Sequence, residues 1–186
     1  MWGTLNVEQT VALRSVILNQ TVHDLGAASM GLSRQLVQLG AAQVVAVDLY
    51  FDGNNRPLPP TIRKVRSDFS DYYEPIDIAF ASWPLNRWSG IEQLIARAPV
   101  VIYLGSNSDG NACGSEKFWD IVTRRQVIAH VPHRENTLII YGAERERRRY
   151  LPEEYAAVDS QREGSMWISY THLQTMKRLP FPPTIV

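Results

Sequence analysis

The sequence has little cysteine, little lysine, no excess of charge of either sign and no long hydrophobic run. Its one cysteine, Cys113, excludes an intrachain disulfide and a cysteine-rich zinc site and favours a reducing, cytoplasmic compartment. The 19 basic residues, mostly arginine, balance 19 acidic ones, so no overall charge attracts nucleic acid. No run approaches the roughly 18 apolar residues of a membrane span, and the first residues do not look like a signal peptide, so we expect neither membrane insertion nor export.

What the sequence does have is the composition of one globular domain, with 186 residues of which 45% are hydrophobic. Apolar residues alternate between the spacing of helices and that of buried strands. We expect strands at 21–25, 43–49, 62–67, 76–81 and 99–104, and a hairpin formed by 126–130 and 137–141. We expect helices after Asn6, from Gly31 to Gly40, after a capping box of Ser89 and Glu92, and around Phe118.

Alternation of strands and helices predicts an α/β fold, a doubly wound Rossmann-like and mostly parallel sheet with a C-terminal antiparallel hairpin. We assign residues 1–143 to this domain. The run ERERRRYLPEEY has too few apolar residues for a core helix. We therefore expect residues 144–186 to be a C-terminal extension that packs on the domain or extends from it. In the first helix, Val7, Val11 and Leu18 share one face.

Acidic and small residues follow the expected strands, at the edge where open α/β sheets bind ligands. In the first turn, DLGAASMGLS, Asp24 precedes Gly26, which permits a tight turn, and a helix that begins near Gly31 presents free amides to a ligand. Asp48 ends the second strand, where doubly wound proteins bind the ribose of an adenosine cofactor. Asp68 follows the third strand, either facing an adenine or capping its own turn.

The segment SWPLN follows the fourth strand, where a substrate would meet such a cofactor. We predict that Ser82, Trp83 and Asn86 border this substrate, although an aromatic residue beside proline often serves packing alone. Tyr72 and Tyr73, just past the third strand, are candidates to cover an adenine or are ordinary loop aromatics.

From about Thr21 to Tyr141 the chain resembles the class I S-adenosylmethionine-dependent methyltransferases. In that family the first strand ends in an acidic residue followed by Gly-x-Gly-x-Gly, the second in an acidic residue, and the third often in Asp. Asp24, Gly26, Asp48 and Asp68 stand at these positions. The first turn is most similar to the DLGAAPGGWS turn of the RNA ribose 2′-O-methyltransferases, but their catalytic lysines and acids have no counterparts here.

The resemblance implies S-adenosylmethionine as cofactor and methyl transfer to an unidentified acceptor. The residues it implies around the cofactor are Asp24, Gly26, Ala28, Gly31, Asp48, Asp68 and Phe69. Met30 stands where the family usually has glycine, and we expect its side chain to crowd the methionine part of the cofactor. The chain is therefore alternatively a catalytically degenerate binding or interaction module. Gly26-x-Ala28-x-x-Gly31 also approximates the nicotinamide-dinucleotide fingerprint.

Two further patterns have ordinary readings beside functional ones. The arginines at 145, 147, 148 and 149, with Arg124 and Arg125, either face the phosphates of an RNA acceptor or form a solvated surface interleaved with glutamates. His130 and His133 have the spacing of a metal pair but lack other ligands, so we expect hairpin histidines and no metal. The oligomeric state is left open.

Overall fold

The structure is a computed structural model that describes residues 5–51, 57–85, 88–106, 113–133 and 136–144. The chain divides into two units, Met1–Arg145 and Glu146–Val186, and the described residues all belong to the first. Nearly all of the predicted C-terminal extension, with the arginines at 145 and 147–149, lies outside the described residues, as does Asn86.

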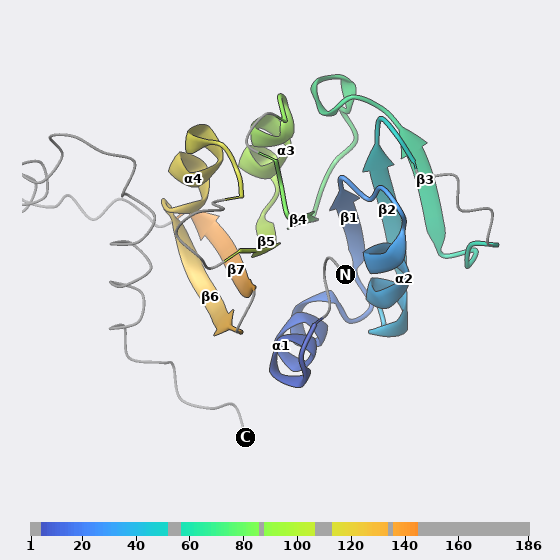
Figure 1. The fold of residues 1–186 in the computed structure, drawn as a ribbon, viewed down its shortest axis with the longest axis horizontal. Coiled ribbons are helices and arrows are strands. Elements are labelled where there is room, and N and C mark those ends of the chain that lie inside the picture. The colour runs from blue at the N-terminus through green and yellow to red at the C-terminus, as the bar shows by residue number, and fades with distance from the viewer. Residues whose placement is uncertain (1–4, 52–56, 86–87, 107–112, 134–135, 145–186) are drawn as a thin grey trace, which may run out of the picture. The chain divides into compact units, whose positions relative to one another are not determined.

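The described residues form a seven-stranded sheet in the order β3-β2-β1-β4-β5-β7-β6 (Figure 1). Its strands are β1 Thr21–Leu25, β2 Gln43–Asp48, β3 Ile62–Arg66, β4 Ile78–Ser82, β5 Val100–Gly105, β6 Arg125–Pro132 and β7 Thr137–Glu144. The first five are parallel, and β7 runs antiparallel to both β5 and β6. The predicted doubly wound sheet with its closing hairpin is confirmed.

The helices are α1 Val7–Ile17, α2 Gly31–Gln38, α3 Ile91–Arg97 and α4 Glu116–Val122, with a 3-10 turn η1 Phe69–Asp71. Leu13 of α1 and Leu36 of α2 belong to one core cluster with Ile102 of β5. The next residue, Tyr103, points to the other face and packs against Phe118 of α4. The two faces of the sheet are thus covered by α1 with α2 and by α4, whose neighbour α3 also contacts η1. Within the described ranges, every helix falls short of the length and apolar character that crossing a membrane requires.

The first helix begins where predicted but turns a different face to the core. Asn6 caps it, accepting a hydrogen bond from the amide of Gln9 while the Gln9 side chain accepts one from the Asn6 amide. Val7 and Val11 are 79% and 64% exposed, and Leu18 is also exposed, so the face that these residues share does not pack on the core.

Gln9 explains this orientation of α1. Its side chain is fully buried with Leu13, and its Nε2 donates to the Asn136 side chain at 2.8 Å and to the Val131 carbonyl at 3.2 Å. A buried amide needs such partners, and the turn between β6 and β7 supplies them. A pattern that counts only apolar residues does not register a buried glutamine.

The predicted capping box of Ser89 and Glu92 is also wrong. The N-cap of α3 is Gly90 in a left-handed conformation, with φ of +87°, and no side chain caps the helix. A Cβ at Gly90 would lie 2.6 Å from the amide nitrogen of Ser70, so the chain passes η1 too closely for any other residue. Glu92 is buried and instead accepts a hydrogen bond from Ser115, the N-cap of α4.

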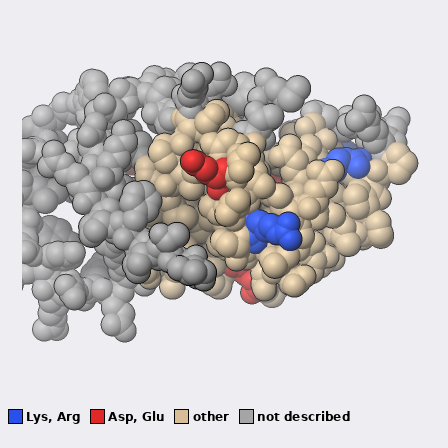
Figure 2. All heavy atoms as spheres, turned by 90° about the horizontal axis from the view of Figure 1, so that it is seen from below, with Lys and Arg blue, Asp and Glu red and all other residues tan. Residues whose placement is uncertain are grey.

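Arg125, which begins β6, is a structural residue. It is 4% exposed, and its guanidinium donates to the carbonyls of Ile95 at 2.6 Å, Ala98 at 2.7 Å and Gly142 at 3.2 Å. The bonds to Ile95 and Ala98 satisfy carbonyls that the end of α3 leaves without helical partners. Both readings of Arg125, a contact to RNA phosphates and a solvated surface, are wrong, because the side chain is enclosed. Seen from below the view of Figure 1, the described charged side chains stand singly among uncharged ones (Figure 2).

Candidate functional site

The predicted site residues follow strands that end side by side. Leu25, which ends β1, pairs with Val47 of β2 on one side and with Ala81 of β4 on the other. The turn between β6 and β7 lies at the same edge, because Thr137 pairs with Gly105 at the end of β5. We call this the carboxyl edge. It is the edge at which doubly wound sheets bind ligands.

The turn after β1 is tightly coiled. Gly26 has a φ of +83° and donates its amide to the Val47 carbonyl at 2.8 Å. Ala28 and Met30 also have positive φ values, +36° and +64°, a conformation that costs side-chain-bearing residues roughly 1–2 kcal/mol each. Strain of this kind persists where surrounding contacts hold it. Here it directs the Ala28 amide toward β2, while Gly31 begins α2 as predicted.

Asp48 is the residue that holds this turn to β2. Its Oδ2 accepts a hydrogen bond from the amide of Ala28 and its Oδ1 one from the amide of Tyr50, both at 2.8 Å. The side chain is only half-buried. Each carboxylate oxygen has two lone pairs, so Asp48 keeps acceptor capacity for a ligand hydroxyl.

Asp24 lies behind the turn rather than on its surface. It is 1% exposed and accepts a hydrogen bond from the hydroxyl of Ser33 in the first turn of α2. Burial raises the pKa of Asp24 to about 6, and the charge of Asp48 raises it further while the Ser33 hydrogen bond opposes the shift. The carboxyl group therefore ties β1 to α2 and titrates close to neutral pH.

Asp68 caps its own turn. Its Oδ1 accepts hydrogen bonds from the Ser70 amide at 2.9 Å and the Ser70 hydroxyl at 2.8 Å, and these bonds lower the pKa of Asp68. The capped-turn reading thus holds, and the remaining oxygen, Oδ2, takes no part in the cap. Phe69 follows, half-buried, with its ring edge-on to that of Trp88 at 5.5 Å.

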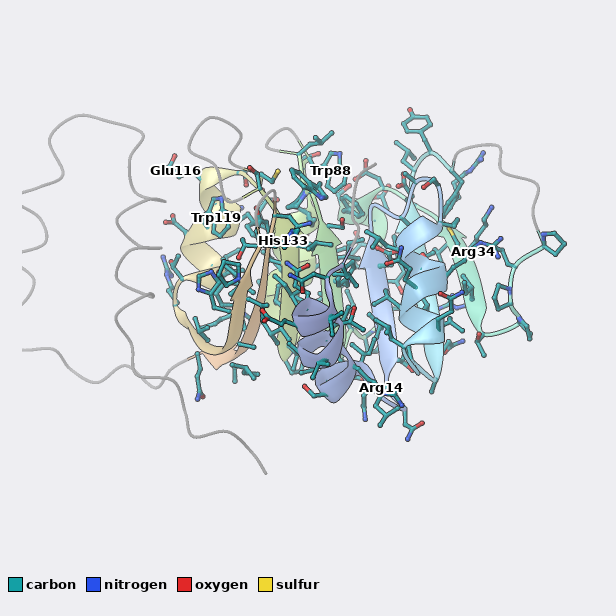
Figure 3. All side chains as sticks on the ribbon, turned by 60° about the horizontal axis from the view of Figure 1, so that its bottom comes forward. Arg14, Arg34, Trp88, Glu116, Trp119 and His133 are labelled. Carbon is teal, nitrogen blue, oxygen red and sulfur yellow. The ribbon has the colours of Figure 1, made fainter. Side chains whose placement is uncertain are left out.

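Trp88, which sequence reasoning missed, covers Gly26. A Cβ built on Gly26 would lie 2.2 Å from Cη2 and 2.7 Å from Cζ3 of Trp88, so the indole is in contact with the glycine backbone. Figure 3 shows Trp88 at the end of the molecule opposite Arg14, the basic residue in the last turn of α1. The available signal was a tryptophan in the loop after β4, at the same edge as a glycine turn.

The end of β4 carries a third strained residue. Trp83 has a φ of +49° and donates its amide to the Leu104 carbonyl at 2.7 Å, while the carbonyl of buried Pro84 accepts from the Gly114 amide at 2.6 Å. Ser82 is half-buried at the end of the strand. Ser82 and Trp83 thus stand at the carboxyl edge, and their contact with a substrate stays a prediction.

Met30 does not enter the ligand side of the turn. Its side chain is 3% exposed and belongs to the core cluster that contains Leu36 and Val22, beneath α2. The prediction that Met30 crowds a methionine moiety is therefore wrong. The left-handed backbone turns the side chain away from the edge and into the core.

His23 and Tyr72 form a buried pair on the opposite face of the sheet from Asp24. His23 is 4% exposed, its ring lies 5.8 Å from that of Tyr72, and burial lowers the pKa of His23. Tyr72 is likewise buried and does not cover the carboxyl edge, whereas Tyr73 is 75% exposed. Among the described residues, no three or more His, Cys, Asp or Glu side chains gather as a metal site would require.

Comparison with known proteins gives structural likeness without sequence similarity. No family model matches the chain, and no curated protein matches it in sequence. Solved structures do match. A candidate RNA methyltransferase from Pyrococcus horikoshii has a TM-score of 0.54 at 17% identity, over 76% of this chain and 82% of that one.

Two of the matched structures contain bound S-adenosylhomocysteine. The 1,6-didemethyltoxoflavin-N1-methyltransferase of Burkholderia thailandensis, with S-adenosylhomocysteine, has a TM-score of 0.54 at 16% identity, over 73% of this chain and 78% of its own. The magnesium protoporphyrin IX methyltransferase of Synechocystis, also with S-adenosylhomocysteine, has a TM-score of 0.52 at 14% identity. The match covers 76% of this chain and 89% of that one. The chain therefore has the class I methyltransferase fold, as its sequence predicts.

Proposed function

We propose that this chain is an S-adenosylmethionine-dependent methyltransferase that binds its cofactor at the carboxyl edge. The single observation that carries the proposal is the carboxylate of Asp48, fixed by the amides of Ala28 and Tyr50 beside the positive-φ turn at Gly26. A fixed carboxylate with acceptor capacity, next to a glycine turn at the end of the first strand, suits the vicinal hydroxyls of a ribose.

The other residues at this edge suit the remaining parts of the cofactor. Leu49, 40% exposed beside Asp48, offers apolar surface to a purine, and Asp68 with Phe69 borders the same region from β3. The turn formed by Gly26, Ala28 and Gly31 is the segment that we expect the methionine part of the cofactor to follow. Asp24 acts through Ser33, holding the turn in shape, since the carboxyl group is enclosed.

The cofactor, when bound, supplies a sulfonium methyl group for an in-line displacement by the acceptor. Positioning provides much of the rate of such a transfer, so the chain needs side chains that orient the acceptor more than it needs a base. We assign this role to Ser82 and Trp83, with Asn86 a prediction outside the described residues. The strained backbone of Trp83 supports the assignment, because such strain concentrates at binding sites.

The acceptor itself remains open within this proposal. RNA is one candidate, but of the arginines that suggested it Arg125 is buried and those at 145 and 147–149 lie outside the described residues. We also propose a cytoplasmic location, because a single cysteine fits a reducing compartment. The rival proposal, an interaction module with this fold and no cofactor, differs in one measurable property, the binding of S-adenosyl compounds.

Isothermal titration calorimetry tests the proposal. We expect S-adenosylmethionine and S-adenosylhomocysteine to bind in the micromolar range, Asp48→Ala to weaken both by about a hundredfold through loss of the ribose contacts, and NAD not to bind. Asp77→Ala, which removes an exposed carboxylate at the other end of β4, is the matched control. Absence of binding to either sulfur compound would leave the interaction module in place, and binding of NAD alone would favour the dinucleotide reading.

A further inference from the structure

The surface that a cofactor has to reach at Gly26 is already covered by a side chain of the same chain. The Trp88 ring lies so close that even a methyl group on Gly26 would overlap it, at 2.2 Å from Cη2. Trp88 comes from the loop between β4 and α3, a separate segment of the carboxyl edge. The contact therefore joins the turn after β1 to the loop after β4, the two segments that we assign to the cofactor and to the acceptor.

A second contact holds the ring there. The indole meets the Phe69 ring edge-on, with centroids 5.5 Å apart and planes inclined by 64°, the favourable T-shaped arrangement. Phe69 belongs to the turn that follows β3. Trp88 thus spans from the glycine turn of β1 to the loop after β3, along the path that the proposed cofactor takes across the edge.

Two atoms cannot share one volume, and the close packing of protein groups leaves no room for a ligand between Gly26 and the indole. The sequence suggested Met30 as an obstruction, but the Met30 side chain lies in the core. Among the described side chains, Trp88 is the one that a Cβ on Gly26 would meet.

We infer that Trp88 competes with the cofactor for the surface of Gly26 and has to leave it before the methionine part binds. This inference rests on the proposed function. Trp88 is then a gating residue in the loop between β4 and α3. It sets the affinity for the cofactor although it lies apart from Asp24, Asp48 and Asp68 in the sequence. Binding of the cofactor has to break the contact between Trp88 and Phe69. The free energy of such an aromatic pair lowers the apparent affinity of the unsubstituted protein by about twofold to tenfold.

The opposite role for the same residue is a stacking partner that holds the cofactor's adenine. The two roles predict effects of opposite sign. Removing a competitor tightens binding, because the population of the open conformation no longer limits the apparent affinity. Removing a stacking partner weakens binding, as a lost aromatic contact does.

Calorimetric titration with S-adenosylhomocysteine distinguishes them. We expect Trp88→Ala to bind about threefold to tenfold more tightly than the unsubstituted protein, and Trp88→Phe to lie between them because the smaller ring covers less of Gly26. Ile128→Ala is the control, since Ile128 is an apolar residue of β6, 45% exposed and outside the candidate site, and its removal should change affinity less than about twofold. A thermal melt of each variant shows that it is folded.

Intrinsic fluorescence gives an independent readout. If the ring leaves Gly26 on binding, S-adenosylhomocysteine changes the emission of the unsubstituted protein, and most of that change disappears in Trp88→Phe. Unchanged or weaker binding by Trp88→Ala, while the unsubstituted protein binds, would overturn the gating role and leave the proposed function intact. No binding by the unsubstituted protein or by any variant would overturn the proposed function and the inference together.

Discussion

The two ends of the sheet satisfy free backbone groups with side chains of opposite charge. At the carboxyl edge, Asp48 accepts hydrogen bonds from the amides of Ala28 and Tyr50. At the other end, Arg125 donates to carbonyls at the end of α3, including those of Ile95 and Ala98. The physical task is the same, but Arg125 is enclosed by carbonyls whereas Asp48 is half-buried with lone pairs to spare. One arrangement is structural, and the other is able to accept a ligand.

The most severe way to break the comparison is to remove the arginine. Arg125→Met keeps an apolar stem but leaves the carbonyls at the end of α3 buried without donors, at a cost of about 1–3 kcal/mol for each unsatisfied group. We expect the free energy of unfolding to fall by about 3 kcal/mol or more in urea denaturation. Arg124→Met is the matched control, because Arg124 is exposed, and it should change stability by less than about 0.5 kcal/mol. Equal effects of the two variants would contradict the structural role of Arg125.

Whereas replacing the enclosed Arg125 should lower the free energy of unfolding, replacing the enclosed Asp24 should raise it at neutral and higher pH. Its raised pKa means that its ionised form costs stability, so the free energy of unfolding falls as pH rises from about 4 through about 6. Asp24→Asn removes this cost. We expect the variant to be more stable at pH 8 by up to about 3 kcal/mol, taking about 1.4 kcal/mol per pKa unit, and to lose this advantage below pH 4.

The measurement is the difference in urea unfolding between Asp24→Asn and the unsubstituted protein across pH. The difference is needed because His23, whose pKa is lowered by burial, gives the opposite slope, with stability lost as pH falls below about 6.5. Asp120→Asn controls for loss of an exposed negative charge. A difference that does not depend on pH would show that Asp24 is not the group that titrates.

Met30→Gly sharpens the comparison at the turn itself. Glycine relieves the left-handed backbone at φ of +64°, worth about 1–2 kcal/mol, but removes a side chain that is 3% exposed, worth about 2–5 kcal/mol. We expect a net loss of about 1–3 kcal/mol of stability by chemical denaturation and no gain in affinity for S-adenosylhomocysteine. A strong gain in affinity would return Met30 to the role of obstruction.

The smallest expected effect concerns the exposed side of α1. Val11 is 64% exposed, so Val11→Ser should change the free energy of unfolding by less than about 0.5 kcal/mol. Leu13→Ala on the buried side should cost about 2–5 kcal/mol. Similar losses from both, measured by urea denaturation, would mean that Val11 lies in an interface.

Sequence alone predicted the strands and a doubly wound sheet with a closing hairpin, because buried parallel strands are continuous apolar runs and the hairpin has its own pattern. It also predicted the placement of Asp48 at a strand end, since this follows from local position. The exact bounds of β1 and the capped start of α1 agree with the structure for the same reason.

What sequence could not predict depends on contacts between distant segments. The orientation of α1 is set by Gln9 reaching Asn136 across 127 positions of sequence separation. The failure of the Ser89 capping box follows from the approach of Gly90 to η1. The position of Trp88 against Gly26 joins two loops whose path no periodicity records. Local patterns thus reached Asp48, Phe69 and Trp83, whereas the position of Trp88 needed the fold.

The most direct test of the account is an amide NMR titration of the uniformly nitrogen-15-labelled chain with S-adenosylhomocysteine, because it reports where binding occurs as well as whether it does. The account predicts shifts concentrated at Gly26, Ala28, Tyr50 and Ser70, around the three strand ends, with the amides near Arg125 unchanged. Shifts confined to the end of the sheet around Arg125, or no shifts at saturating ligand, would contradict a cofactor site at the carboxyl edge.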